Sequence, residues 1–330
     1  MSVSLNTGAP PLGLISRPNI ARLIRYALCD WCVIVVAWCA MGLLPTWLYA
    51  IEILIIAGRL HALGVVLHDA CHMNRRQGFS MLLELLAAYP IATTLDAMRY
   101  HHLRHHRNNG MPLDPYFKLG VSHDPIKFSI ACIRGLLLAP AWIVRCYFGS
   151  AAIVLPRLRN SYARVFLGDR SGLDLTHSPE LLRCLRSEPR QAIFFLVVLT
   201  LGWHYPAAVI FGYLIPLIIA GVLNAHRVIA EHIHVACHDR RAETVIATTV
   251  THDWGIIGNL IFFPRNIGYH TVHHLFPYAS LDCLPALHAW HIGSGSRTNR
   301  TKDANSATTQ KSELGQSEPA LVESMGNPEQ

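Results

Sequence analysis

Three long apolar runs, at residues 26–44, 48–67 and 191–224, constrain this chain more than any other feature of its sequence. A helix needs about 20 apolar residues to cross a bilayer, so each of the first two runs is long enough for one crossing. The third run is broken near 204–206, which predicts two short helices joined by a tight turn. Only 15% of the residues are charged, against roughly 25% in soluble domains. We therefore expect an all-α integral membrane protein with about four transmembrane helices in two hairpins.

A few charged residues interrupt the apolar sequence. Asp30 lies in the first run and Arg59 in the second. Residues 81–95 and 130–155 are also apolar, but the first segment is short and the second contains Arg145. We expect these two segments to form buried helices or helices that lie at the membrane surface.

The positive charge predicts the orientation in the membrane. Of the 28 lysine and arginine residues, 16 lie within 75–190, whereas the predicted turns at 44–50 and 202–206 contain none. Because positive loops stay in the cytoplasm, we expect both termini and the central segment there. Contact of this basic rim with anionic lipid accounts for the net charge of +7. No nucleic-acid motif is present, so we expect no nucleic-acid partner.

The composition divides the chain into three parts. Residues 1–25 form a polar N-terminal lead, and residues 26–293 form the membrane domain. From 294 to 330 the sequence consists largely of Ser, Thr, Asn, Gln, Glu and Lys. Such a segment cannot bury enough apolar surface to fold, so we expect a disordered cytoplasmic tail.

Histidines form three clusters next to the apolar runs. Residues three and four apart on a helix share a face, so each cluster can direct two or three imidazoles at one point. Neutral imidazole is a ligand for zinc, copper, iron and nickel, and a single zinc site needs only three or four protein ligands. The number of histidines therefore predicts a cytoplasmic, histidine-rich site for two metal ions. The clustered residues are His68, His72, His102, His105, His106, His270, His273 and His274.

In chain order the clusters read H-x3-H, H-x2-H-H and H-x2-H-H, with one predicted membrane hairpin before the first and another between the second and third. This arrangement resembles the membrane-bound fatty acid desaturase and hydroxylase superfamily over roughly residues 25–290. The neighbouring sequence adds to the resemblance, because Asp114-Pro115 follows the second cluster and the third lies within PRNIGYHTVHHLFP at 264–277.

The resemblance implies a di-iron centre that uses O2 as co-substrate to oxidise an unactivated C–H bond. The eight clustered histidines would be iron ligands, and His232, in the motif Arg227…Glu231-His232, would be the ninth. Metal-bound imidazoles usually donate their second N–H to a carboxylate or carbonyl. Asp69, Asp114 and Glu231 are the candidate carboxylates for that role.

The resemblance also implies the reaction, an O2-dependent introduction of a double bond into an aliphatic chain, with a fatty acyl or lipid substrate as the first expectation. Hydroxylation by the same centre and desaturation of a small non-lipid metabolite in a biosynthetic pathway are alternatives that the sequence does not separate. A histidine-rich metal transporter or storage protein is an alternative of another class. Transport sites lie near the bilayer midplane, whereas these clusters lie outside the predicted spans.

Electrons for such a reaction need a separate source. The sequence contains neither the haem-binding motif His-Pro-Gly-Gly nor the spacing of a four-cysteine iron–sulfur cluster. We expect an external ferredoxin, rubredoxin or b-type cytochrome with its reductase. The absence of a fused cytochrome domain and the short length favour a bacterial inner-membrane protein with a cytoplasmic active site.

Overall fold

The computed structural model describes residues 7–73 and 80–293. The chain divides into two compact units, Pro10–Leu287 and a second unit made of Met1–Ala9 and His288–Gln330. In the second unit the described residues are 7–9 and 288–293, and the latter are helical. The predicted tail at 294–330 lies outside the described residues. The histidine clusters and the helices that carry them all belong to the first unit.

The described part of the first unit is helical, with one isolated β-bridge between His232 and Thr249. This confirms the predicted all-α class. The α-helices are α1 (Ile20–Met41), α2 (Tyr49–Ala70), α3 (Ser80–Leu83), α4 (Leu95–Asn108), α5 (Pro125–Ile133), α6 (Leu138–Val154), α7 (Arg159–Phe166), α8 (Pro179–His204), α9 (Pro206–Val209), α10 (Ile215–Ala230), α11 (Ala242–Thr248), α12 (Gly255–Ile261) and α13 (His270–Leu275).

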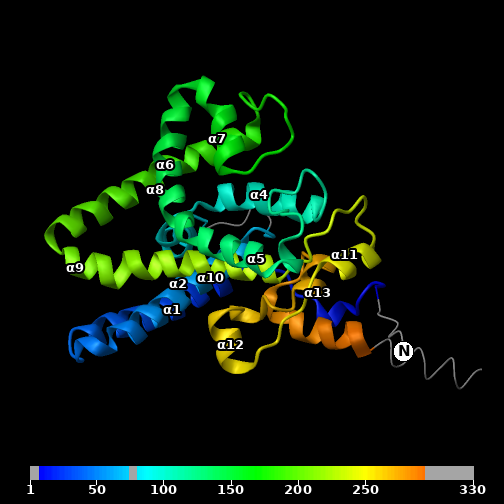
Figure 1. Ribbon diagram of the computed structural model, residues 1–330, viewed down its shortest axis with the longest axis horizontal. Coiled ribbons are helices and arrows are strands. Elements are labelled where there is room, and N and C mark those ends of the chain that lie inside the picture. The colour runs from blue at the N-terminus through cyan, green and yellow to red at the C-terminus, as the bar shows by residue number, and fades with distance from the viewer. Residues whose placement is uncertain (1–6, 74–79, 294–330) are drawn as a thin grey trace, which may run out of the picture. The chain divides into compact units, whose positions relative to one another are not determined.

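The first hairpin consists of α1 and α2, which pack against each other (Figure 1). Asn19 begins α1, because its Oδ1 accepts a hydrogen bond from the backbone N–H of Ala21 at 2.9 Å. Most of α2 is buried, whereas α1 exposes apolar side chains such as Val36. A long helix with an exposed apolar face is suited to contact with lipid.

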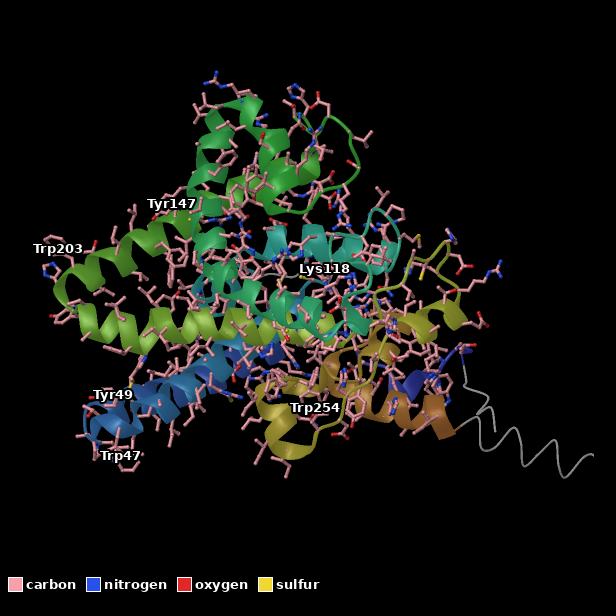
Figure 2. All side chains as sticks on the ribbon, in the orientation of Figure 1. Trp47, Tyr49, Lys118, Tyr147, Trp203 and Trp254 are labelled. Atoms are coloured by element: carbon pink, nitrogen blue, oxygen red, sulfur yellow. The ribbon has the colours of Figure 1, made fainter. Side chains whose placement is uncertain are left out.

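The second hairpin consists of α8 and α10, joined through α9 and the π-helical turn η8 (Ile210–Leu214). Figure 1 shows the turns of both hairpins on the same side of the first unit, away from α4 and α13. Trp47, Tyr49 and Trp203 lie at these hairpin ends (Figure 2). Tryptophan and tyrosine are enriched where helices leave the membrane, so this end is suited to a membrane–water interface.

Within residues 7–73 and 80–293, four helical segments are each long and apolar enough to cross a membrane: Ile20–Met41, Thr46–Ala70, Pro125–Val154 and Pro206–Ala230. Their number agrees with the prediction, but the identity of one segment differs. The segment made of α5, η6 (Arg134–Leu137) and α6 is long and apolar enough to span a membrane, whereas α8, which contains part of the third apolar run, is not among the candidate spans. Arg145, whose charge predicted a surface helix, is fully buried, and its Nε lies 3.0 Å from Oε1 of Glu188 in α8. Since this charge is paired inside the protein, the outer face of α6 stays apolar.

A sharp bend separates the apolar residues Met81–Ile91 from α4. The two segments meet at 77°. Ala92 has a left-handed φ of 60°, and Thr94 then begins α4 by accepting a hydrogen bond from the backbone N–H of Ala97 at 3.2 Å. The second histidine cluster therefore starts about two turns along α4.

Candidate metal centre

Nine histidines gather into two groups inside the first unit. Within each group the candidate ligand nitrogens all lie within 4.8 Å of one another. The sequence predicted the same nine residues as ligands, and the structure brings them together from helices that are far apart in the chain. The five-histidine group is His68, His72, His102, His106 and His273, and the four-histidine group is His105, His232, His270 and His274.

Helical geometry divides the second cluster between the two groups. His102 and His106 are four residues apart on α4, so they share a face and enter the five-histidine group. His105 projects from a neighbouring face of the same helix and enters the four-histidine group. One helix thus supplies ligands to both groups.

The third cluster is also divided between the two groups, but its pair of histidines four residues apart enters the other group. On α13, His270 and His274 are the pair four residues apart, and they enter the four-histidine group, whereas His273 enters the other. His232 follows directly after α10 and completes the four-histidine group. Because α4 and α13 each contribute to both groups, the two groups are neighbours.

The distances between the nitrogens fit metal coordination. Nε2 of His102 lies 2.9 Å from Nε2 of His72 and 3.1 Å from Nε2 of His106. In the other group, Nε2 of His232 lies 2.9 Å from Nε2 of His105. Metal–imidazole bonds of about 2.0–2.1 Å place neighbouring ligand nitrogens roughly 2.9–3.4 Å apart. Each group therefore has a donor set suited to one metal ion.

Burial favours the neutral form of the imidazoles of His72, His270 and His274. Burial lowers the pKa of His72 to about 4, and the guanidinium of Arg99 adds to this effect. Burial and the neighbouring imidazoles lower the pKa values of His270 and His274 well below the ordinary value. Neutral imidazole has a free ring-nitrogen lone pair, so these side chains are in the form that binds metal at neutral pH.

Asp114 holds the outward nitrogen of His105. Its Oδ1 lies 2.9 Å from Nδ1 of His105, and the backbone N–H groups of Gly110 and Tyr116 donate to its carboxylate at 3.0 and 2.9 Å. Burial acts to raise the pKa of Asp114, but His105 and these N–H groups outweigh it and lower the pKa below its ordinary value. The side chain is therefore an ionised acceptor that leaves Nε2 of His105 free for a metal.

Glu231 has the corresponding position beside His270. Its Oε2 lies 3.4 Å from Nδ1 of His270 and accepts a hydrogen bond from Nη1 of Arg227 at 2.8 Å. Burial raises the pKa of Glu231 to about 7, although Arg227 opposes the shift. Next to it, Nδ1 of His232 lies 2.9 Å from the carbonyl of Val228, one turn earlier. The last turn of α10 thus orients the imidazole of His232 by a hydrogen bond, and the next residue, Glu231, lies beside that of His270.

Asp69, the third predicted carboxylate, has a different neighbour. Its Oδ2 accepts a hydrogen bond from Ser280 Oγ at 3.4 Å, so it contacts the segment after the third cluster. No sequence motif predicted a role for Tyr116, whose ring centroid lies 4.5 Å from that of His105 and whose hydroxyl lies 2.6 Å from Nδ1 of His101. Its place two residues after Asp114 is the only local clue.

Comparison with known families places these observations in context. The family model described as fatty acid desaturase matches residues 45–297, which is more than half of the chain. The chain belongs to the fatty acid desaturase family. It is a desaturase-type oxidoreductase and an integral membrane protein, and its histidine groups are consistent with the histidine boxes of the family. Enzymes of this family generally need an electron donor. No protein in a curated collection matches the chain significantly.

A cavity of about 270 Å³ adjoins both histidine groups of this desaturase. His68 and His102 line it from one group, and His105, His232 and His270 line it from the other. Such a position brings a bound molecule next to both candidate metal sites.

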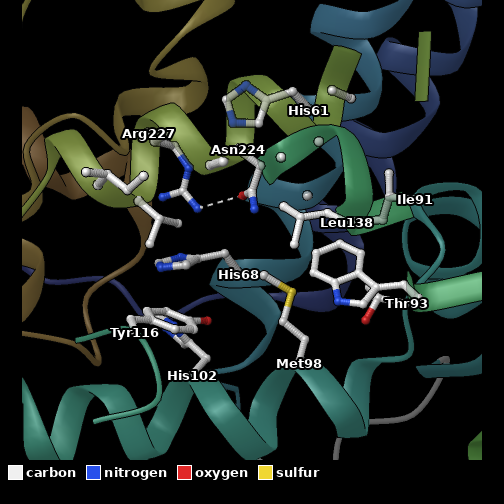
Figure 3. A pocket seen from close by; sticks show the side chains of 18 of the residues that line it. His61, His68, Ile91, Thr93, Met98, His102, Tyr116, Leu138, Asn224 and Arg227 are labelled. Carbon is white, nitrogen blue, oxygen red and sulfur yellow. Dashed lines mark hydrogen bonds between the residues drawn. The ribbon is translucent and has the colours of Figure 1, made fainter. Parts of the chain in front are cut away.

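The two ends of the cavity differ in chemistry. Figure 3 shows Ile91, Met98 and Leu138 toward one end, with Tyr116 and Arg227 toward the other. The cavity wall is largely apolar and includes residues from α2, α6 and α10.

Two glycines let the walls of this cavity approach closely. Gly135 of η6 and Gly221 of α10 both line the cavity, and a Cβ on Gly221 would lie 2.6 Å from the carbonyl oxygen of Gly135. Only glycine allows this backbone contact. The contact holds η6 and α10 together along one side of the cavity.

Proposed function

We propose that the two histidine groups bind two iron ions and that the enzyme introduces a double bond into an aliphatic chain, most directly a fatty acyl or lipid substrate. The observation that carries this proposal is the apolar cavity that adjoins both groups. An apolar cavity of this kind excludes water and takes up hydrocarbon by the hydrophobic effect. A polar metabolite would leave its hydrogen-bonding groups unpaired against most of that wall.

The residues around the site have separate roles in this proposal. The nine histidines hold the metals, and Asp114 and Glu231 fix the orientation of His105 and His270. The two iron ions, with O2 as co-substrate, supply the oxidising power that an unactivated C–H bond requires. The cavity wall holds the chain against the histidine groups, so that one segment of the substrate lies close to both.

The proposal includes an external electron donor, which is a ferredoxin, a rubredoxin or a b-type cytochrome with its reductase. Exposed arginines after α6 and in the first half of α8 supply positive charge with which an acidic donor protein would pair. Positive charge on this segment also favours its cytoplasmic location, with the metal centre on the same side. The exposed arginines are Arg157, Arg164, Arg170, Arg186 and Arg190.

Mass spectrometry of lipid and polar extracts tests the proposal. Cells that supply an electron donor would express the wild type, His102→Ala or His204→Ala, and their extracts would be compared. His102 belongs to the five-histidine group, whereas His204 is exposed at the turn of the second hairpin and serves as the matched control. We expect a product that lacks two hydrogens in the wild type and in His204→Ala, and its loss in His102→Ala.

Other outcomes separate the alternatives. A product with one added oxygen would identify a hydroxylase. A product confined to the polar extract would indicate a small metabolite in place of a lipid. Full activity of His102→Ala would contradict the assignment of this histidine to the metal centre. Measured iron bound to the purified proteins would separate loss of the metal from loss of the substrate.

A further inference from the structure

The backbone is strained just before the third histidine cluster. Arg265 and Asn266 have φ values of 56° and 64°, a left-handed conformation that residues other than glycine rarely adopt. They lie a few residues before His270, the first ligand candidate of α13. Strain of this kind persists only where surrounding contacts hold it, and the contacts of Arg265 identify what holds it here.

Arg265 is bound to the first membrane helix. Its Nη2 lies 2.5 Å from Oδ2 of Asp30 and donates to the carbonyl of Tyr26 at 2.9 Å. The guanidinium carbon also lies 4.4 Å from the centroid of the Tyr26 ring, within the range of a cation–π contact. One side chain thus makes three contacts with α1.

Asp30 joins this contact to the second membrane helix. Its carboxylate is almost fully buried in α1, and Oδ1 lies 3.3 Å from Nη1 of Arg59 in α2. Arg59 in turn donates to the carbonyl of Leu260 at 2.7 Å. Asp30 and Arg59, two of the three charged residues within the apolar runs, are therefore explained, because both bind the segment that leads to the third cluster.

The same segment is held from its other side. The backbone N–H of His252 donates to the carbonyl of Gly268 at 2.8 Å, and a Cβ on Gly268 would lie only 2.3 Å from the carbonyl oxygen of His252. Nε2 of His252 lies 2.8 Å from the carbonyl of Ala230, at the end of α10. The chain just before His270 is therefore fixed between the two hairpins.

We propose that Asp30 and Arg265 are positioning residues for the third histidine cluster, and that they secure the metal of the four-histidine group in particular. This inference rests on the metal centre proposed above. His270 and His274 are two of the four donors in that group, whereas His273 is one of five in the other. Displacement of α13 removes half of the donors from one group and a fifth from the other, so only the first loses its metal.

Metal stoichiometry tests the proposal without reliance on activity. The full-length protein in detergent would be stripped of metal, reconstituted anaerobically with Fe2+, desalted and measured for metal per chain. We expect two ions in the wild type and one in Asp30→Asn and Arg265→Gln. Arg265→Lys keeps the charge opposite Asp30 and should retain the second ion. Asp239→Asn, which changes a partly exposed carboxylate outside both histidine groups, should also bind two ions.

The remaining outcomes are decisive as well. Two ions in both Asp30→Asn and Arg265→Gln would overturn the positioning role. Loss of both ions from these variants, together with a loss of helical circular dichroism, would replace positioning by a general role in folding. If Asp30→Asn does not fold, Arg265→Gln with its lysine counterpart decides the question. Fewer than two ions in the wild type would refute the metal centre itself, which distinguishes that failure from failure of the positioning role.

Discussion

The contact between Asp114 and His105 gives a prediction whose size follows from the structure. In Asp114→Asn one carboxylate oxygen becomes an NH2 group. The carboxylate accepts from Nδ1 of His105 and from the backbone N–H groups of Gly110 and Tyr116, so the amide must face at least one of these donors. A buried donor left without an acceptor costs about 1–3 kcal/mol.

The metal affinity should fall as well, because a neutral amide orients His105 less strongly than a carboxylate. Loss of such a partner typically lowers metal affinity by about 10- to 100-fold, which corresponds to about 1.4–2.7 kcal/mol. His105 belongs to the four-histidine group. We therefore expect weaker binding of one metal ion and unchanged binding of the other.

Chelator competition on the purified protein measures both affinities, with metal counted after each step. Asp169→Asn is the matched control, since Asp169 is also buried and accepts a hydrogen bond from Tyr100 of α4 at 2.8 Å, but contacts neither histidine group in the described residues. The control should lose stability and keep both affinities. The reasoning is refuted if Asp114→Asn binds both ions as tightly as the wild type, or if the control loses one ion equally.

Further predictions concern the cavity and the pH dependence. Gly221→Ala should lower the unfolding free energy by about 1–3 kcal/mol, because its Cβ would lie 2.6 Å from the carbonyl of Gly135; thermal unfolding measures this, and a midpoint equal to that of the wild type would contradict it. Gly64→Phe should reduce turnover on the order of 10- to 100-fold with two metals retained. Gly64 lines the cavity, and among the described residues a Cβ there would have Ile91 as its nearest neighbour, at an ordinary contact distance of 3.5 Å. Metal analysis that finds fewer ions in this variant would refute a purely steric effect. In the metal-free protein the pKa of His72 is about 4, against an ordinary value of 6.5. The unfolded chain then binds more protons, so stability is fully present above pH 6.5 and is lost as the pH falls toward about 4; a pH-independent unfolding midpoint of the metal-free protein would argue against it.

The amino-acid sequence determined the features that depend on local spacing. Apolar runs of helical length indicated two hairpins, and histidines four residues apart had to share one face of a helix. Those rules predicted the all-α class and eight of the candidate ligands without knowledge of any contact, whereas the ninth, His232, came from the resemblance to the family. They also predicted that more than one metal ion would be needed, because the histidines are too numerous for a single site.

Tertiary structure alone decided how these parts combine. Spacing does not say which histidine joins which group, because that depends on how α4 and α13 approach each other. Spacing also does not say which residue pairs with a charge inside an apolar segment. Arg145 predicted a surface helix, yet Glu188, 43 residues later in the chain, pairs with it inside the protein. Asp30 binds Arg265, a partner 235 residues away. The sequence records that a buried charge needs a partner, but only the folded chain brings that partner within reach.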